Sequence, residues 1–418
     1  NTIIEKSALG FKLSNGKLLP DSVEIINTER VSNNTKWQPV YGERKEYSDN
    51  YNEVLIHLAC AGWQGKMALR VRAYNEGVAF RYEVNSNEEF QIEKEITEFT
   101  YPVDADVWVS NAAQSEIKKQ KLSSLSSIAE RPLLAELSDS VYTAVGEAAL
   151  VDFARMKFKK HQLKANTLVA SLEKGFKNQY PVIVPAAGYS TPWRYVMAGE
   201  NAAHILQNNY LLLNLNEGNR ITNTSFIKPG KVIREVTLTT QGGMACVDFA
   251  VKHNLQFVHY DAGWYGAEND NASDATTITV DPKRSPGPLD LQKVIDYANE
   301  YGIGIILYVN RRALEKQLDE ILPLYKSWGI AGLKFGFVNV GPQKWTSWLH
   351  ESIRMAAEHE LMVNVHDEYR PTGFSRTFPN LMTMEGIRGD EESTPNDGVI
   401  NTIFTRIFWG GLLKTIFC

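Results

Sequence analysis

The chain has few cysteines, no long apolar run and no excess of basic charge. Its three cysteines, among 418 residues, share no metal-ligand spacing, so neither a zinc site nor a disulfide framework is indicated. Because no run of about 20 apolar residues is present, the sequence predicts no helix that spans a membrane. A formal net charge of -5 offers no basic surface to nucleic acid, and no glycine-rich phosphate loop follows a predicted strand. Nucleic-acid binding, membrane spanning and nucleotide chemistry are therefore not predicted.

The length of 418 residues exceeds that of an average domain and predicts about two or three domains. The first residues, Asn1–Glu5, include neither an initiator methionine nor a basic stretch. We therefore expect a processed or trimmed chain from which any signal peptide is absent.

Residues 1–226 are predicted to form an N-terminal β-sandwich domain. Short alternating or β-branched runs recur along them, for example Glu53–His57, Gly77–Val84 and Tyr210–Leu213. Turn residues such as Ser14–Gly16 separate the runs, and no helical period is evident. Many short strands at this spacing are typical of a sandwich.

Residues 227–418 are predicted to form a (β/α) barrel, because strand and helix patterns alternate there. The expected strands are Val236–Thr240, Gln256–Tyr260, Gly304–Tyr308, Gly332–Phe335, Leu361–Val365 and Leu381–Met384. Helices are expected near Gly243–His253, Leu289–Tyr301, Arg312–Trp328 and Lys344–His359, and another from Val399. A closed barrel has eight strands and about 250 residues, so about six of eight units are present here. The predicted fold class is multidomain, β followed by α/β, with a (β/α)8-type barrel incomplete at its C-terminus.

Polar residues follow the expected strands where each strand ends, notably Asp261, Asn310, His366–Glu368 and Glu385–Glu392. Parallel barrels place their chemistry at this end of the strands, so we expect these side chains to converge. Carboxylates that converge on one pocket indicate acid–base chemistry or a hard cation. The alternative is that they are solvated loop charges.

An aromatic residue, Trp264, stands close to Asp261 in the sequence. A carboxylate beside an aromatic face suits a sugar ring, although Trp264 could equally be a core residue. Glycoside hydrolysis needs two carboxyl groups, about 5 Å apart for retention of configuration and about 6.5–9.5 Å apart for inversion. The strand ends supply enough acids for such a pair.

At these positions the chain resembles glycoside hydrolase family 97, whose members are α-glucosidases and α-galactosidases. The matching segments, which lie in order along most of the chain, are Gly146–Leu150, Thr191–Arg194, Ile227–Gly230, Asp261–Trp264, Asn364–His366, Arg370–Gly373, Arg376–Asn380, Glu385–Gly389 and Phe404–Arg406. The resemblance implies an N-terminal β-super-sandwich, a (β/α)8 barrel and a calcium ion at the base of the pocket. It also implies cleavage of terminal α-linked glucose or galactose from oligosaccharides, and an extracytoplasmic, periplasmic location.

The resemblance also assigns roles to individual residues. Glu391 is expected to be the general acid that protonates the leaving oxygen. The expected calcium ligands are Glu147, Glu385, Glu391 and Asp367. The expected substrate contacts are Asp261, Trp264, Lys334, His366 and Arg388.

Two strand ends depart from the family pattern. Retaining members carry an aspartate nucleophile at the position of Gly336, whereas inverting members have glycine there. Inverting members take their base from a glutamate at the position of Asn310 and from the residue at Asp367, which Glu368 follows here. The resemblance therefore predicts inversion, with Asp367 or Glu368 as the catalytic base.

Two other functions stay open beside hydrolysis. A retaining enzyme that has lost its nucleophile would bind carbohydrate without turnover, which Gly336 and Asn310 favour. The apolar tail, residues 407–418, matches nothing in the family pattern and marks the barrel as truncated. A protein that binds partners through its sandwich half is the third reading.

Overall fold

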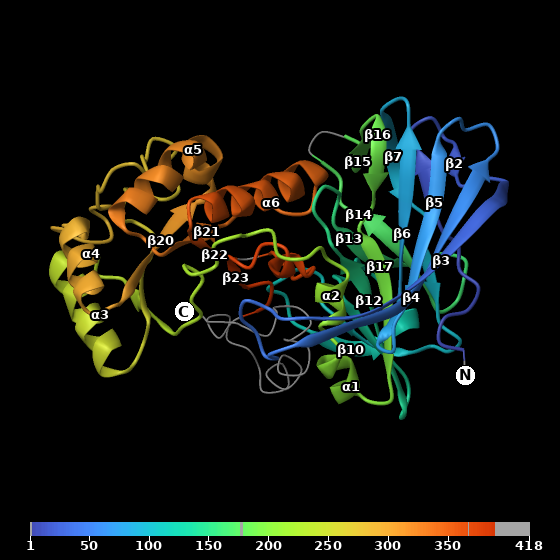
Figure 1. Ribbon diagram of the computed structural model, residues 1–418, viewed down its shortest axis with the longest axis horizontal. Helices are drawn as coiled ribbons and strands as arrows, with labels where there is room; N and C mark the ends of the chain where they lie inside the picture. The colour runs from blue at the N-terminus through green and yellow to red at the C-terminus, as the bar shows by residue number, and fades with distance from the viewer. Residues whose placement is uncertain (1, 176–178, 367, 389–418) are drawn as a thin grey trace.

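A computed structural model of the chain describes residues 2–175, 179–366 and 368–388 (Figure 1). The β-rich half of the chain lies at one side, and the half that alternates strands with helices lies at the other. The strands of the first half are β1 (Phe11–Leu13), β2 (Leu18–Leu19), β3 (Val23–Trp37), β4 (Tyr47–Cys60), β5 (Lys66–Ala73), β6 (Gly77–Ser86), β7 (Phe90–Glu95), β8 (Glu98–Thr100), β9 (Asp106–Val109), β10 (Lys118–Lys121), β11 (Leu133–Ser138), β12 (Val141–Ala148), β13 (Met156–Lys160), β14 (Thr167–Leu172), β15 (Val182–Val184), β16 (Ala187–Ser190) and β17 (Trp193–Gly199). The short helices of this half are η1 (Leu122–Ser124), α1 (Ala202–Gln207) and α2 (Leu211–Asn214).

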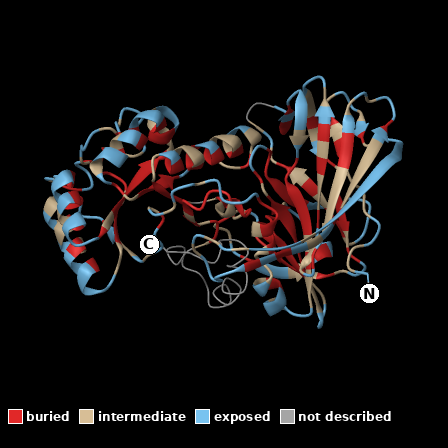
Figure 2. Cartoon of the chain, viewed as in Figure 1, coloured by how far each residue is buried: buried red, intermediate tan, exposed pale blue. Residues whose placement is uncertain are grey.

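These strands form sandwich-like antiparallel sheets around one apolar core. The largest has ten strands in the order β10-β9-β11-β12-β17-β6-β5-β4-β3, with β16 also paired to β6. A four-stranded sheet, β15-β7-β1-β2, and a three-stranded sheet, β13-β14-β8, lie beside it. The core takes side chains from all three sheets, such as Val107, Phe11 and Phe158. In Figure 2 this core is the buried interior of the β-rich half.

One predicted strand of this half is wrong. Tyr210–Leu213 lies in and beside helix α2, where Leu211, Leu212 and Leu215 are buried against the outer face of the sandwich. A run of four apolar residues has no period that separates a buried strand from one helical turn, and tertiary packing decided the outcome.

The described part of the second half contains a parallel sheet of six strands in sequence order. They are β18 (Val232–Glu235), β19 (Phe257–Tyr260), β20 (Gly304–Asn310), β21 (Gly332–Gly336), β22 (Met362–Val365) and β23 (Leu381–Met384), with the short helix η2 (Phe374–Arg376) before β23. Helices α3 (Thr240–Lys252), α4 (Leu291–Glu300), α5 (Arg311–Trp328) and α6 (Gln343–Glu358) pack on its outer face (Figure 1). The sheet curls as a half-barrel. The general prediction, a β-sandwich followed by an incomplete parallel barrel, is confirmed.

The first strand of this sheet was predicted in the wrong place. Residues 236–239 form an irregular connection, Thr240 begins α3, and the strand β18 lies just before them. The backbone amides of Thr237 and Leu238 donate to the carboxylate of Glu235, and the Thr239 side chain caps α3. The side-chain hydrogen bonds of this threonine-rich segment therefore hold a turn and a helix start instead of a strand.

No helix in the described part of the chain is long and apolar enough to cross a membrane.

Candidate active site

The inner face of the half-barrel changes from apolar at its base to polar at the carboxyl ends of the strands. Phe257, Ile306 and Met362 form a small apolar cluster at the base, separate from the helix-side core. Side chains alternate across a strand, so the residues two and four positions further along face the same way. These inner positions are Arg234, His259, Asp261, Tyr308, Asn310, Lys334, Gly336, Asn364 and His366. The sequence prediction that polar groups converge at the strand ends is thus matched by the register of the sheet.

Asp261 is held as a carboxylate at the end of β19. Its Oδ2 lies 3.3 Å from Arg234 Nη1, and its Oδ1 accepts from the Ala262 amide at 2.8 Å. Burial alone would raise the pKa of Asp261, but the positive charge of its surroundings outweighs burial and lowers the pKa. Protonated His259 contributes to this effect only at low pH, whereas the hydrogen bond from the Ala262 amide and the charges of Lys334 and Arg234 also act at neutral pH. Asp261 can therefore accept hydrogen bonds from sugar hydroxyls.

Two histidines of this site are held neutral. Burial, followed by the charge of Lys334, lowers the pKa of His259 to about 3. The same two causes lower the pKa of His366, although the negative charges of Glu385 and Asp261 oppose them. His366 Nε2 stands 3.4 Å from Glu385 Oε2, and Glu385 Oε1 accepts from Gln114 of the sandwich at 3.3 Å. A neutral His366 can both donate and accept a hydrogen bond, which suits a hydroxylated ligand.

Trp264 is not at the surface of this site. Its side chain is fully buried in the helix-side core, and its Nε1 donates to the carbonyl oxygen of Tyr308 at 2.8 Å. The rings of Tyr265 and Tyr325 pack against it edge to face. The structure therefore contradicts the predicted substrate contact, because Trp264 faces the helices behind the sheet.

Glu147 lies on β12 in a fully buried network of charges. Its Oε1 accepts from Arg131 Nε at 2.6 Å and from the Met156 amide at 3.1 Å, and its Oε2 accepts from Arg194 Nη1 at 2.8 Å. Arg194 also binds Glu95 with two hydrogen bonds. Two guanidinium groups already neutralise Glu147, so in this arrangement it does not fit a calcium ligand.

Of the other predicted calcium ligands, Glu385, Asp367 and Glu391, the structure describes only Glu385. Among the residues that the structure describes, no group of three or more His, Cys, Asp or Glu side chains is arranged to hold a metal ion. Asp367 and Glu391, two of the predicted ligands and catalytic groups, lie outside the described residues. Arg388, a predicted substrate contact, is half-buried and is the last residue that the structure describes.

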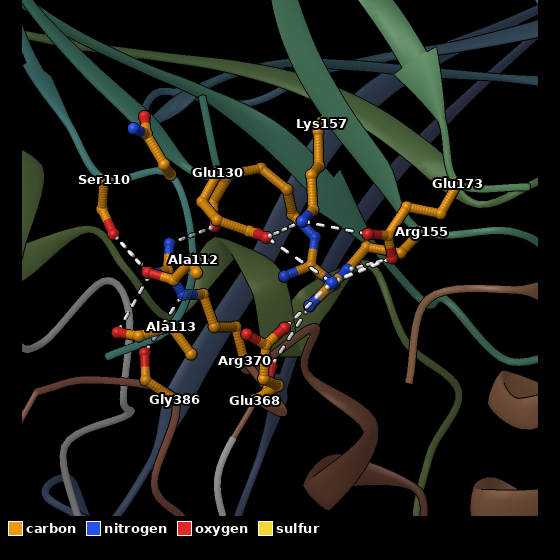
Figure 3. Close-up of polar contacts among 12 residues, drawn as sticks. Ser110, Ala112, Ala113, Glu130, Arg155, Lys157, Glu173, Glu368, Arg370 and Gly386 are labelled. Carbon is orange, nitrogen blue, oxygen red and sulfur yellow. Dashed lines mark hydrogen bonds and ion pairs between the residues drawn. The ribbon is translucent and has the colours of Figure 1, made fainter. Parts of the chain in front are cut away.

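Glu368 faces the sandwich, contrary to its predicted role as a base (Figure 3). Its Oε2 lies 3.2 Å from Arg155 Nη2, and its backbone carbonyl accepts from Arg155 Nη1 at 3.3 Å. Arg155 also pairs with Glu173 at 2.8 Å and with Glu130 at 3.6 Å, and Lys157 lies 2.7 Å from Glu130. A carboxylate committed to this cluster is an anchor for its loop, so we do not retain Glu368 as the catalytic base.

The sequence analysis missed Arg234, His259 and Tyr308. His259 and Tyr308 stand two positions before Asp261 and Asn310, and Arg234 stands two positions after Val232 on β18, so by the alternation along each strand all three face the inside of the half-barrel. Tyr308 fills the space above Gly336: a Cβ built on that glycine would overlap the phenol ring, and Asn310 Nδ2 donates to the Tyr308 hydroxyl at 3.3 Å. The period of two along the predicted strands could have found His259 and Tyr308, whereas Arg234 lies before the misplaced first strand.

Comparisons with known proteins agree with this architecture. The family descriptions "Glycosyl-hydrolase 97 N-terminal" and "Glycoside hydrolase 97" match residues 1–218 and 223–387. A "Retaining alpha-galactosidase" of Bacteroides thetaiotaomicron is 23% identical over 93% of this chain and 63% of its own length. A "Probable retaining alpha-galactosidase" of Streptomyces bingchenggensis is 25% identical over 98% of this chain and 64% of its own length. Both are named retaining enzymes, which conflicts with the inversion predicted from Gly336.

Solved structures extend the likeness. A family 97 enzyme from Pseudoalteromonas sp. strain K8, in complex with acarbose, superposes with a TM-score of 0.88 at 26% identity and covers 98% of this chain and 69% of its own. A β-arabinopyranosidase, at 16% identity and a TM-score of 0.81, shares the fold. The chain spans less than two thirds of the length of the curated relatives it matches. The two family matches together cover most of the chain, and the protein belongs to glycoside hydrolase family 97.

Proposed function

We propose that this chain is an α-glycosidase that releases a terminal α-linked galactose or glucose from an oligosaccharide. The observation that carries the proposal is the polar inner face of the half-barrel, where Asp261, Lys334 and His366 meet Glu385 in a member of family 97. Relatives named retaining α-galactosidases, and a family 97 structure that holds acarbose, support the reaction class and the substrate class.

The described residues divide the proposed work between them. Asp261 accepts from sugar hydroxyls, and Lys334 donates to them. His366, held neutral, bonds one hydroxyl while Glu385 orients its ring across 3.4 Å. Glu391 stays the predicted general acid, with the proton delivered to the leaving oxygen.

Calcium dependence and a periplasmic location also stay predictions from the family resemblance. If calcium binds, its ligands come from Glu385 with Asp367 and Glu391, and it would add positive charge beside the sugar hydroxyls. Glu147 is not among them unless its ion pairs with Arg131 and Arg194 open.

The experiment is proton NMR of the purified chain with p-nitrophenyl α-galactoside and α-glucoside, first with calcium and then with EDTA. We expect one of the two glycosides to be hydrolysed, and the preferred glycoside identifies the sugar. An α-anomer at early times would establish retention and require a nucleophile from a position other than 336, whereas a β-anomer would establish inversion. Hydrolysis of neither glycoside would refute the proposal. Loss of hydrolysis in EDTA, restored by calcium, would establish the metal requirement.

A non-catalytic carbohydrate-binding protein is the second candidate, because Gly336 supplies no side chain to the strand end. Calorimetry that detects sugar binding, with no turnover of either glycoside over days, would select it. The variant Asp261→Asn should then weaken binding, which ties the heat to this site.

A further inference from the structure

Two arginines cross the boundary between the sandwich and the half-barrel in opposite directions. Arg155, just before β13 of the sandwich, reaches the loop after β22 and binds Glu368 through both its carboxylate and its carbonyl oxygen. Arg370, from that same loop, reaches back into the sandwich (Figure 3). We call these two side chains the arginine clasp.

The guanidinium group of Arg370 donates hydrogen bonds to backbone carbonyl and side-chain hydroxyl oxygens. It donates to the Arg131 carbonyl at 3.3 Å, to the Ser110 hydroxyl at 3.2 Å and to the Ala112 carbonyl at 3.2 Å, all in the sandwich. Its Nε donates to the Gly386 carbonyl at 3.1 Å, in the loop after β23. One buried guanidinium therefore joins the loops after two neighbouring barrel strands to a single part of the sandwich.

Burial makes this arrangement selective for arginine. The Arg370 side chain is fully buried, and burial lowers its pKa to about 10, with the charge of Glu130 opposing that effect. A lysine at the same place has one ammonium group and cannot reach oxygens on several sides, whereas the planar guanidinium carries five donors.

The loops that the clasp holds are the ones that carry the proposed chemistry. Glu368 and Arg370 follow His366 within four residues, and Gly386 directly follows Glu385. The His366–Glu385 distance of 3.4 Å therefore depends on two loops whose common support lies in the other half of the chain.

We propose that Arg155 and Arg370 are positioning residues: the sandwich, through the arginine clasp, sets the geometry of His366 and Glu385 and so determines the rate of glycoside cleavage. This inference rests on the proposed function. Several contacts contribute to the affinity for the sugar, so a small shift of one loop changes the affinity little. The reaction rate depends on the position of the reacting groups, and a shift of about 1 Å can lower it on the order of 10²-fold.

The test compares Arg370→Lys and Arg155→Lys with a control, Arg376→Lys, in the full chain. Arg376 also lies in the loop between β22 and β23 and also contacts the sandwich, at the Leu213 carbonyl (3.1 Å) and Asp49 (3.4 Å). Its hydrogen bonds and ion pairs within the described part of the chain go to Asp49 and Leu213 and not to Glu368 or Gly386, so it reports the general cost of weakening the boundary.

We expect kcat for the preferred p-nitrophenyl glycoside to fall on the order of 10²-fold in the two clasp variants, with a change in KM of about threefold or less. Arg376→Lys should keep kcat within about twofold at a temperature where all variants are folded. A clasp variant with wild-type kcat, or a control that loses as much as the clasp variants, would overturn the proposal.

Hydrogen exchange tests the positioning role of Arg155 and Arg370 independently of the glycosidase activity. The Glu385 amide donates to the Val365 carbonyl at 3.0 Å, and exchange of the peptides around residues 363–388 should accelerate in the clasp variants while β12 and β17 keep their protection. If the wild-type chain hydrolyses neither glycoside, the proposed function fails and the rate claim fails with it. Unchanged exchange in that case would overturn the positioning role as well, whereas accelerated exchange would uphold it.

Discussion

Glu130 should carry a large share of the stability of the boundary between the two halves at neutral pH. It is fully buried, and its carboxylate lies 2.7 Å from Lys157 and 3.6 Å from Arg155. Burial alone would raise the pKa of Glu130, but the charges of Arg155, Arg370 and Lys157 outweigh it and lower the pKa from 4.5 to about 2. Each pKa unit corresponds to about 1.4 kcal/mol, so ionised Glu130 stabilises the fold by roughly 3 kcal/mol.

The variant Glu130→Gln removes the charge and keeps the shape. Because the pKa is lower in the folded than in the unfolded chain, the folded chain binds fewer protons between these two pKa values. The contribution of Glu130 is therefore complete above pH 4.5 and is lost as the pH falls towards 2. We expect the variant to be less stable than the wild type by about 3 kcal/mol at pH 7 and by about 1 kcal/mol at pH 3.

Urea unfolding, followed in parallel by tryptophan fluorescence and circular dichroism, measures this difference at each pH. Coincidence of the two signals checks that one transition is observed. Glu358→Gln is the control: Glu358 pairs with Arg354 on the exposed face of α6, where such a pair contributes about 0.5 kcal/mol. A loss below about 1 kcal/mol at pH 7, or an equal loss at pH 3 and pH 7, would refute the reasoning.

Three further predictions concern other buried groups. Arg194→Met removes the cation that buried Glu95 binds and one of the two that buried Glu147 binds, so the free energy of unfolding should fall by about 3–5 kcal/mol in urea, and a loss below about 1 kcal/mol would contradict this. Gly336→Ala places a methyl group against the Tyr308 ring and should lower the free energy of unfolding by about 1–3 kcal/mol. In a double-mutant cycle, the same substitution should cost less in the Tyr308→Leu variant than in the wild type. Burial lowers the pKa of His350 to about 4, so between pH 6.5 and pH 4 the unfolded chain binds a proton that the folded chain does not. The stability of the wild type should therefore fall over this range, and its advantage in thermal unfolding over His350→Gln should become smaller.

The strands and helices of the second half were predictable because their signals are strong. No end of helix α5 or α6 lies more than one residue from its predicted position, and β23 has its predicted range. Their apolar residues recur with clear periods, and buried parallel strands read as short apolar runs between them. Segments of four or five residues, such as Tyr210–Leu213, carry no such period, and packing against the sandwich decided their structure.

The candidate site was predictable in place and less so in detail. The rule that chemistry gathers at strand ends found Asp261, His366 and Glu385, which the structure brings to the inner face. It could not tell that Trp264 turns toward the helices, because residues after a strand end follow the loop instead of the alternation along the strand. It also could not find the partners of Glu147 and Glu368, which are arginines of other segments, 16 and 47 residues from Glu147 and 213 residues from Glu368.

The phenol ring of Tyr308 over Gly336 restricts the order in which this site can change during evolution. A side chain gained first at position 336 meets the ring, and a smaller residue gained first at position 308 leaves a buried void, so each single step costs stability. The two positions, on the neighbouring strands β20 and β21, should therefore change together or not at all. Among relatives, a larger residue at the position of Gly336 should accompany a smaller residue at the position of Tyr308.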